Sequence, residues 1–156
     1  MKRRAVIAAL TLGLSFPVAA DDQSAGKSQA TYTPRLAEIM ISTQLRHFKL
    51  WYAGRVGNWE LAKYELAQIK ASLADAPKYY PNVPAADMGM LEQPEGDVSS
   101  AIESKDSPNF AKAFGRLTAA CNSCHEATGF RFIEIMEPRL SPIETSPFSD
   151  QTFSPR

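Results

Sequence analysis

The sequence predicts an all-α domain that folds as an antiparallel four-helix bundle. Apolar residues recur at spacings of three and four over several segments, which is the pattern of amphipathic helices. Two of these segments are preceded by Thr-Pro or Ser-Pro, which is a typical helix start. The connection between the first two segments is only a few residues long, so these helices are expected to be antiparallel neighbours.

The first helix is expected to begin at Thr33-Pro34, with Thr33 as the N-cap and Pro34 in the first helical position. Gly54 and Gly57 are expected to end it. The residues at helical spacing along its predicted buried face are Leu36, Ile39, Met40, Thr43, His47, Leu50 and Trp51.

The second helix is expected to start after Asn58, which is a good N-cap, and to stop near Pro77. Prolines and glycines between residues 77 and 96 predict a loop or a broken helix. A short third helix is expected over 97–105. The fourth begins at Ser107-Pro108 and is expected to end at Gly129.

The fourth helix carries the chemistry-bearing motif, Cys121-Asn122-Ser123-Cys124-His125. Both cysteines fall on the apolar stripe of the helix, and a histidine follows directly. This spacing is the attachment signature of a c-type haem, in which each thiol adds to one haem vinyl group. His125 would then be the proximal iron ligand.

Three other uses of the two cysteines fit the sequence less well than haem attachment. A thioredoxin-like motif belongs to a βαβ unit, and nothing before Cys121 has a strand pattern. A zinc site needs about four ligands, and beyond the motif the chain has one histidine, His47, and no cysteine. A disulfide between residues three apart closes too small a loop to stabilise much.

An export signal at the N-terminus agrees with haem attachment. Lys2, Arg3 and Arg4 precede an apolar run, and small residues end at Ala20. The run is shorter than the roughly 20 residues of a membrane span. Residues 1–20 are therefore expected to be a cleaved signal peptide, which predicts a periplasmic protein with no membrane span after cleavage.

Removal of the signal would leave 136 of the 156 residues, the size of one domain. The polar segment 21–32 is expected to be a flexible leader, residues 33–129 the haem-binding bundle, and 130–156 an extended proline-rich tail packed on it. Without the three basic residues of the signal, 14 basic and 17 acidic residues remain. This acidic balance argues against nucleic acid and favours protein redox partners or a small ligand.

Four helices with Cys121, Cys124 and His125 near the end of the last one resemble the class II c-type cytochromes, the cytochrome c-prime-like family. The resemblance implies a left-handed antiparallel bundle with one covalent haem c, and a periplasmic role in electron transfer or gas binding. Two features depart from the family: 31 residues follow His125, and prolines interrupt the third helix. Such departures indicate a divergent member.

The sixth iron ligand could be Met40, His47 or neither. These residues lie seven apart, about 10 Å along a helix, so one iron cannot take both. In an antiparallel bundle the early part of the first helix meets the late part of the fourth, which favours Met40. His47 is expected to be a buried histidine hydrogen-bonded to a tyrosine, a carboxylate or a propionate.

Two functions follow from this choice of ligand. With Met40 on the iron the protein would be a one-electron carrier. Without a sixth protein ligand it would bind nitric oxide or carbon monoxide. An enzyme is not expected, since a peroxidase needs a polar acid–base residue at an open distal site. The apolar stripes would also suit a homodimer.

Overall fold

The computed structural model describes residues 32–83, 88–138 and 155. The chain divides into two compact units, Met1–Tyr32 and Thr33–Arg156. The signal peptide expected over 1–20, the leader up to residue 31 and most of the tail, 139–154, lie outside the described residues.

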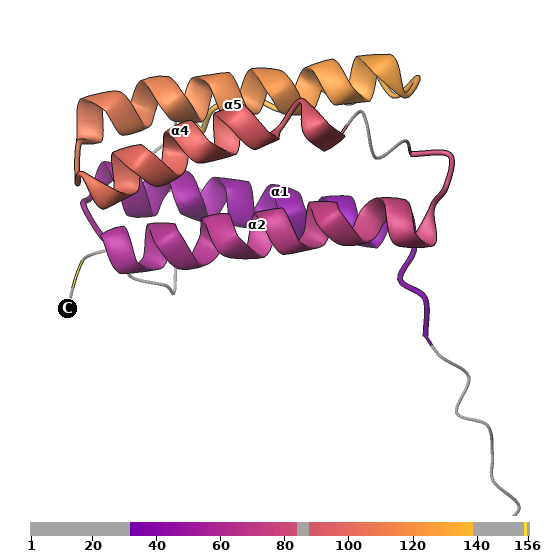
Figure 1. Cartoon of the computed structure of the whole chain (residues 1–156), viewed down its shortest axis with the longest axis horizontal. Coiled ribbons are helices and arrows are strands. Elements are labelled where there is room, and N and C mark those ends of the chain that lie inside the picture. Colours follow the sequence, from indigo (N-terminus) through magenta and orange to yellow (C-terminus); the bar gives the residue numbers. More distant parts are fainter. Residues whose placement is uncertain (1–31, 84–87, 139–154, 156) are drawn as a thin grey trace, which may run out of the picture. The chain divides into compact units, whose positions relative to one another are not determined.

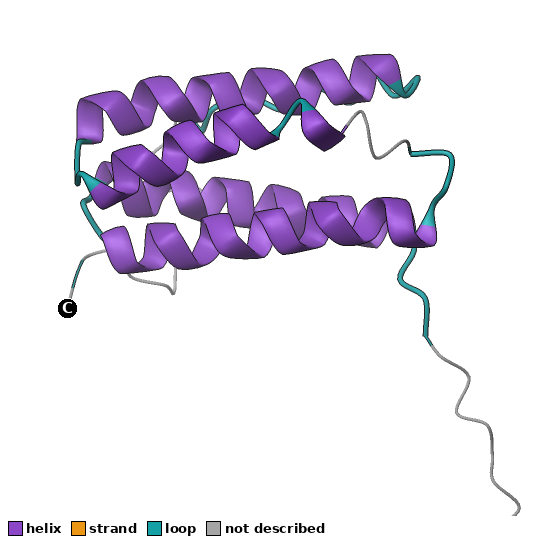
Figure 2. Ribbon diagram, viewed as in Figure 1, coloured by secondary structure: helices purple, strands orange, loops and turns teal. Residues whose placement is uncertain are grey.

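In the second unit, the described residues form helices α1 (Leu36–Arg55), α2 (Trp59–Tyr79), α4 (Glu92–Glu103) and α5 (Ser107–Ala127), and no strand (Figure 1 and Figure 2). Helix α1 packs on α2 and α4 on α5, while α2 contacts α4 and α1 contacts α5. Consecutive helices run in opposite directions (Figure 1). The all-helical fold is confirmed, and its arrangement is that of a four-helix bundle. None of these helices is both long and apolar enough to cross a bilayer.

Helix α1 begins two residues later than Thr33-Pro34 predicted. Its N-cap is Arg35, whose backbone N–H donates to the Glu38 carboxylate at 2.9 Å. The guanidinium of Arg35 donates to the other oxygen of Glu38 at 2.7 Å. The Glu38 side chain therefore closes the first turn of the helix, the role of the acidic residue in a capping box.

The prolines of the middle segment end the helices less sharply than expected. Pro77 lies inside α2, which continues to Tyr79. Helix α4 starts at Glu92, within the predicted loop, and includes Pro94 in its first turn. The first-turn N–H groups of a helix have no partner within it, so a proline there removes no hydrogen bond.

Helix α5 is capped one residue before the predicted Ser107. The Asp106 carboxylate accepts a hydrogen bond from the backbone N–H of Asn109 at 3.0 Å. At its other end Gly129 has φ of 84°, the left-handed conformation that stops a helix at low steric cost, as predicted.

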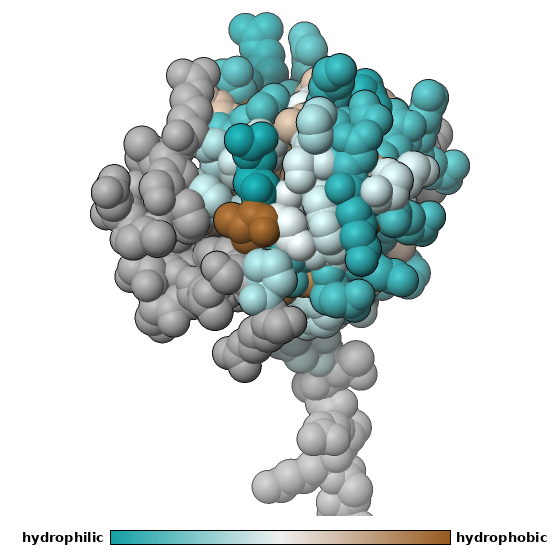
Figure 3. Space-filling view, turned by 90° about the vertical axis from the view of Figure 1, so that its left-hand side faces the viewer, coloured by the Kyte–Doolittle hydropathy of each residue, from teal (hydrophilic) through white to brown (hydrophobic). Residues whose placement is uncertain are grey.

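The turns α1–α2 and α4–α5 lie at the same end of the bundle, and the described surface there is mostly hydrophilic (Figure 3). Beneath it, aromatic rings from three helices pack together: Trp51, Trp59, Phe110 and Phe114. Gly54 was expected to end the first helix, but it lies inside α1, where a Cβ would clash with the Phe110 ring. The glycine allows α1 and α5 to approach closely.

One charge in this region is buried. Glu65 of α2 is 1% exposed. Its carboxylate accepts a hydrogen bond from Arg46 of α1 at 3.1 Å and lies 3.8 Å from the Lys49 ammonium. An ion pair thus joins α1 to α2, and it shields the carboxylate from the cost of burial without a partner.

Candidate functional site

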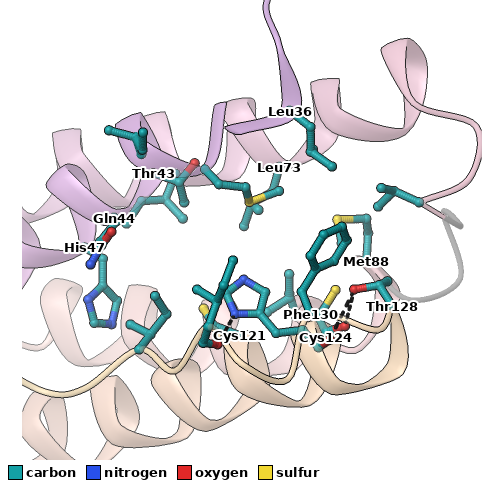
Figure 4. A pocket seen from close by; sticks show the side chains of 18 of the residues that line it. Leu36, Thr43, Gln44, His47, Leu73, Met88, Cys121, Cys124, Thr128 and Phe130 are labelled. Carbon is teal, nitrogen blue, oxygen red and sulfur yellow. Dashed lines mark hydrogen bonds between the residues drawn. The ribbon is translucent and has the colours of Figure 1, made fainter. Parts of the chain in front are cut away.

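A cavity of about 520 Å³ lies near the end of the bundle opposite the two turns. Helices α1 and α5 face each other across it, and Met88 and Phe130 lie at one side (Figure 4). Its wall is almost entirely apolar, and among the residues that the structure describes no Asp, Glu, Lys or Arg side chain contributes to it. The residues that α1 and α2 contribute are Leu36, Ala37, Met40, Ile41, Thr43, Gln44, His47, Ile69 and Leu73.

All four residues predicted as site residues line this cavity. Cys121, Cys124 and His125 come from the last turns of α5, and Met40 comes from the second turn of α1. The antiparallel arrangement brings these two helix ends together, which is the juxtaposition that the bundle topology predicted. Figure 4 shows both cysteine side chains on the cavity side of α5.

The two cysteines are not joined by a disulfide. Burial, together with the neighbouring Cys124 and Glu95, raises the pKa of the Cys121 thiol to about 12. Disulfide-exchange motifs depend on a thiol with a lowered pKa, because the thiolate is the nucleophile. The environment of Cys121 has the opposite effect, which disfavours a thioredoxin-like role.

The ring of His125 is oriented by a backbone carbonyl. Its Nδ1 lies 2.9 Å from the carbonyl oxygen of Ile133, eight residues further along the chain. A carbonyl only accepts hydrogen bonds, so Nδ1 carries a proton, and in the neutral ring the lone pair is then on Nε2. Metal-binding histidines commonly show this arrangement, in which a hydrogen bond on one nitrogen fixes the other as the ligand.

A second methionine, Met88, lines the same cavity and was not considered as a ligand from the sequence. It lies in the predicted loop between α2 and α4, where no helical periodicity assigns a side chain to one face. Only the fold brings it to the site. The cavity therefore contains two thioethers, that of Met40 on α1 and that of Met88 in the segment between α2 and α4.

His47 lies further along α1 and also contributes to the wall. It is buried, as expected, and its Nε2 is 2.8 Å from the hydroxyl oxygen of Thr118. Its partner is a threonine hydroxyl on α5, and not the tyrosine or carboxylate that was expected among the protein groups. Burial lowers the pKa of His47 to about 4.

The segment after α5 completes the site. Residues 129–138, here termed the C-terminal strap, contribute Phe130, Ile133 and Ile135 to the cavity wall. In the described part of the chain, no three His, Cys, Asp or Glu side chains converge as they would around a metal ion such as zinc. Comparisons with protein-family models, with curated proteins and with solved structures find no match for this chain.

Proposed function

We propose that this chain is a periplasmic monohaem c-type cytochrome that transfers single electrons between protein partners. One haem c would be attached through thioethers at Cys121 and Cys124, with His125 as the proximal ligand. The observation that carries the proposal is that these three side chains and Met40 line one apolar cavity. On this proposal the chain is a divergent member of the class II c-type cytochromes.

The cavity suits a haem in size, polarity and donor chemistry. Its volume of about 520 Å³ lies within the usual range of cofactor pockets, and its wall is apolar. Thioether attachment needs two thiols and one imidazole near each other. It does not need a cluster of three protein ligands around one metal ion, as a zinc site does. Cys121, Cys124 and His125 line the same cavity, and the hydrogen bond at Nδ1 of His125 leaves Nε2 as the atom that would bind the iron.

The chain's own residues would set the conditions for electron transfer. When bound, the haem supplies the redox couple. The apolar wall offers water few hydrogen-bonding partners, and the thioether of Met40 would occupy the sixth coordination position and stabilise the reduced state. The described wall of the cavity has no charged side chain, so these residues would compensate the iron's charge weakly.

The second candidate function is the binding of nitric oxide or carbon monoxide. Leu36 and Ala37 lie beside Met40 in the cavity wall. If the Met40 sulfur does not bind the iron, these apolar groups would lie beside an open coordination position. Such a five-coordinate site would admit a diatomic gas but would offer it no charged partner.

Optical spectra of the exported protein test the proposal directly. The protein would be matured in a host that makes c-type cytochromes and measured oxidised, reduced, and reduced with carbon monoxide. A low-spin spectrum with a methionine-to-iron charge-transfer band, unchanged by carbon monoxide, is the expected result. A high-spin spectrum that shifts with carbon monoxide would establish the gas-binding alternative, and absence of any haem spectrum would refute both.

Two matched variants identify the sixth ligand. Met40→Leu and Met88→Leu each remove one thioether from the cavity while keeping its volume and apolar character nearly unchanged. Met40→Leu is expected to abolish the charge-transfer band and to allow carbon monoxide to bind, whereas Met88→Leu leaves both unchanged. The reverse result would assign the ligand to Met88.

A further inference from the structure

The C-terminal strap is attached to α5 by the side chain of Asn122, which lies between the two cysteines of the motif. The amide nitrogen Nδ2 of Asn122 donates to the carbonyl oxygen of Ile135 at 2.8 Å. Its Oδ1 accepts from the backbone N–H of Ile135 at 2.7 Å. One side chain thus satisfies both backbone groups of a strap residue, as a neighbouring strand would.

The strap returns along α5 through a compact turn. The backbone N–H of Phe130 donates to the carbonyl of His125 at 2.7 Å, and that of Ile133 donates to the carbonyl of Phe130 at 2.8 Å. Gly129, with φ of 84°, provides the reversal. This turn places the carbonyl oxygen of Ile133 next to Nδ1 of His125. Ile133 lies two residues before Ile135, the residue that Asn122 binds.

We propose that Asn122 is a positioning residue for the axial ligand. It holds the strap at Ile135, and the strap in turn keeps the Ile133 carbonyl oxygen on the Nδ1 proton of His125. The ring is then fixed with Nε2 available to the iron. This inference rests on the proposed function, since it assigns a role to a residue of the same site.

The physical effect expected is on the electron donation of the imidazole. A carbonyl that accepts the Nδ1 proton makes the ligand nitrogen more basic, which favours ferric over ferrous iron. His125 is only partly buried, so water competes for Nδ1 wherever the carbonyl moves away. A rigid attachment of the strap is therefore needed to keep the hydrogen bond to protein rather than to solvent.

The test compares Asn122→Ala with Ser123→Ala in the haem-loaded protein. Ser123 is also between the cysteines, but it is exposed, and its hydroxyl donates to the Ala119 carbonyl of its own helix at 3.1 Å. The two measurements are the midpoint potential and the hydrogen-exchange rate of the His125 Nδ1 proton by NMR. Loss of the hydrogen bond between His125 Nδ1 and the Ile133 carbonyl is expected to change both the midpoint potential and the exchange rate.

Asn122→Ala is expected to raise the ferrous-to-ferric ratio at fixed ambient potential by about tenfold, which corresponds to about 59 mV for one electron. The Nδ1 proton should exchange faster, while Ser123→Ala leaves both quantities unchanged. Asn122→Asp keeps the acceptor for Ile135 N–H and loses the donor. The exchange rate of the Nδ1 proton in Asn122→Asp should lie between the rates in the wild-type protein and in Asn122→Ala.

An Asn122→Ala protein with attached haem, an unchanged potential and an unchanged exchange rate would overturn the inference while leaving the proposed cytochrome function intact. A wild-type protein without covalent haem would instead refute the proposed function. If Asn122→Ala is not matured, the exchange rate in Asn122→Asp decides: a wild-type rate would contradict the positioning role.

Discussion

The imidazole Nε2 of His47 and the hydroxyl oxygen of Thr118 lie 2.8 Å apart and join α1 to α5 in the interior. The Thr118 hydroxyl donates its proton to the Phe114 carbonyl at 3.0 Å, so Nε2 of His47 must donate to Thr118. The Phe114 ring lies 4.3 Å from the imidazole, centroid to centroid. Burial of His47 disfavours the charged ring and lowers its pKa to about 4.

This neutral histidine predicts that acid destabilises the protein well above the range of carboxylate titration. The pKa of His47 falls from 6.5 in the unfolded chain to about 4 in the folded one, so between these values only the unfolded state binds the proton. Stability is fully present above pH 6.5 and declines as the pH falls toward 4. The full loss is about 3 kcal/mol and is reached below pH 4; urea unfolding should measure about 2–3 kcal/mol of it between pH 7 and pH 4.5.

His47→Gln provides the control for this pH dependence. The glutamine can donate to Thr118 but does not titrate, so the difference in unfolding free energy between pH 7 and 4.5 should shrink by about 2–3 kcal/mol. Burial raises the pKa of the Glu95 carboxyl, and that contribution is present in both proteins. An equal pH dependence in the two proteins would show that His47 does not titrate in this range.

Most of the helical fold was predictable because its helices are amphipathic. The stripe that predicted α5 contains Phe110, Phe114 and Leu117, all of which are buried. The boundaries were less predictable, because local side chains compete for the orphan backbone groups at helix ends. The Glu38 carboxylate moves the start of α1 past Pro34, and Asp106 precedes Ser107 as the cap of α5.

The site was predictable where the motif is local and unpredictable where the fold assembles it. Cys121, Cys124 and His125 are adjacent in sequence, and helix direction alone related Met40 to them. Met88 and the strap lie outside any periodic segment, so no pattern assigned them to the cavity. The hydrogen bonds of Asn122 to Ile135 depend on a chain reversal whose only sequence signal is Gly129.

Gly54→Ala is predicted to destabilise the bundle by about 1–3 kcal/mol, because a Cβ at this position would overlap the Phe110 ring. Gly96→Ala is the matched control. That glycine lies inside α4 with no atom within 4 Å of an added Cβ, so alanine should stabilise the protein by about 0.5–1 kcal/mol. Chemical denaturation measures both, and destabilisation by both substitutions would contradict the steric account.

Glu65→Ala is predicted to cost about 1–3 kcal/mol of unfolding free energy, since it removes the partner of Arg46 and Lys49 at the α1–α2 interface. The cost stays below that of a fully buried pair because both cations retain about a quarter of their exposure, 27% and 25%. Glu60→Ala, at an exposed position of the same helix, should cost no more than about 0.5 kcal/mol. Equal effects in thermal or urea unfolding would place Glu65 on the solvated surface.

Single and double serine substitutions of the cysteines test haem attachment. In the matured wild-type protein, neither Cys121 nor Cys124 should react with a thiol alkylating agent after denaturation, because both sulfurs would be thioethers. Cys121→Ser and Cys124→Ser should each keep haem on the denatured chain through the remaining bond, with a pyridine haemochrome spectrum shifted toward that of a free vinyl group. The double variant should lose all haem on denaturation. Alkylation of both thiols in the exported wild-type protein would show that the motif does not attach haem. That result would favour a zinc site or a thiol–disulfide role for the two cysteines.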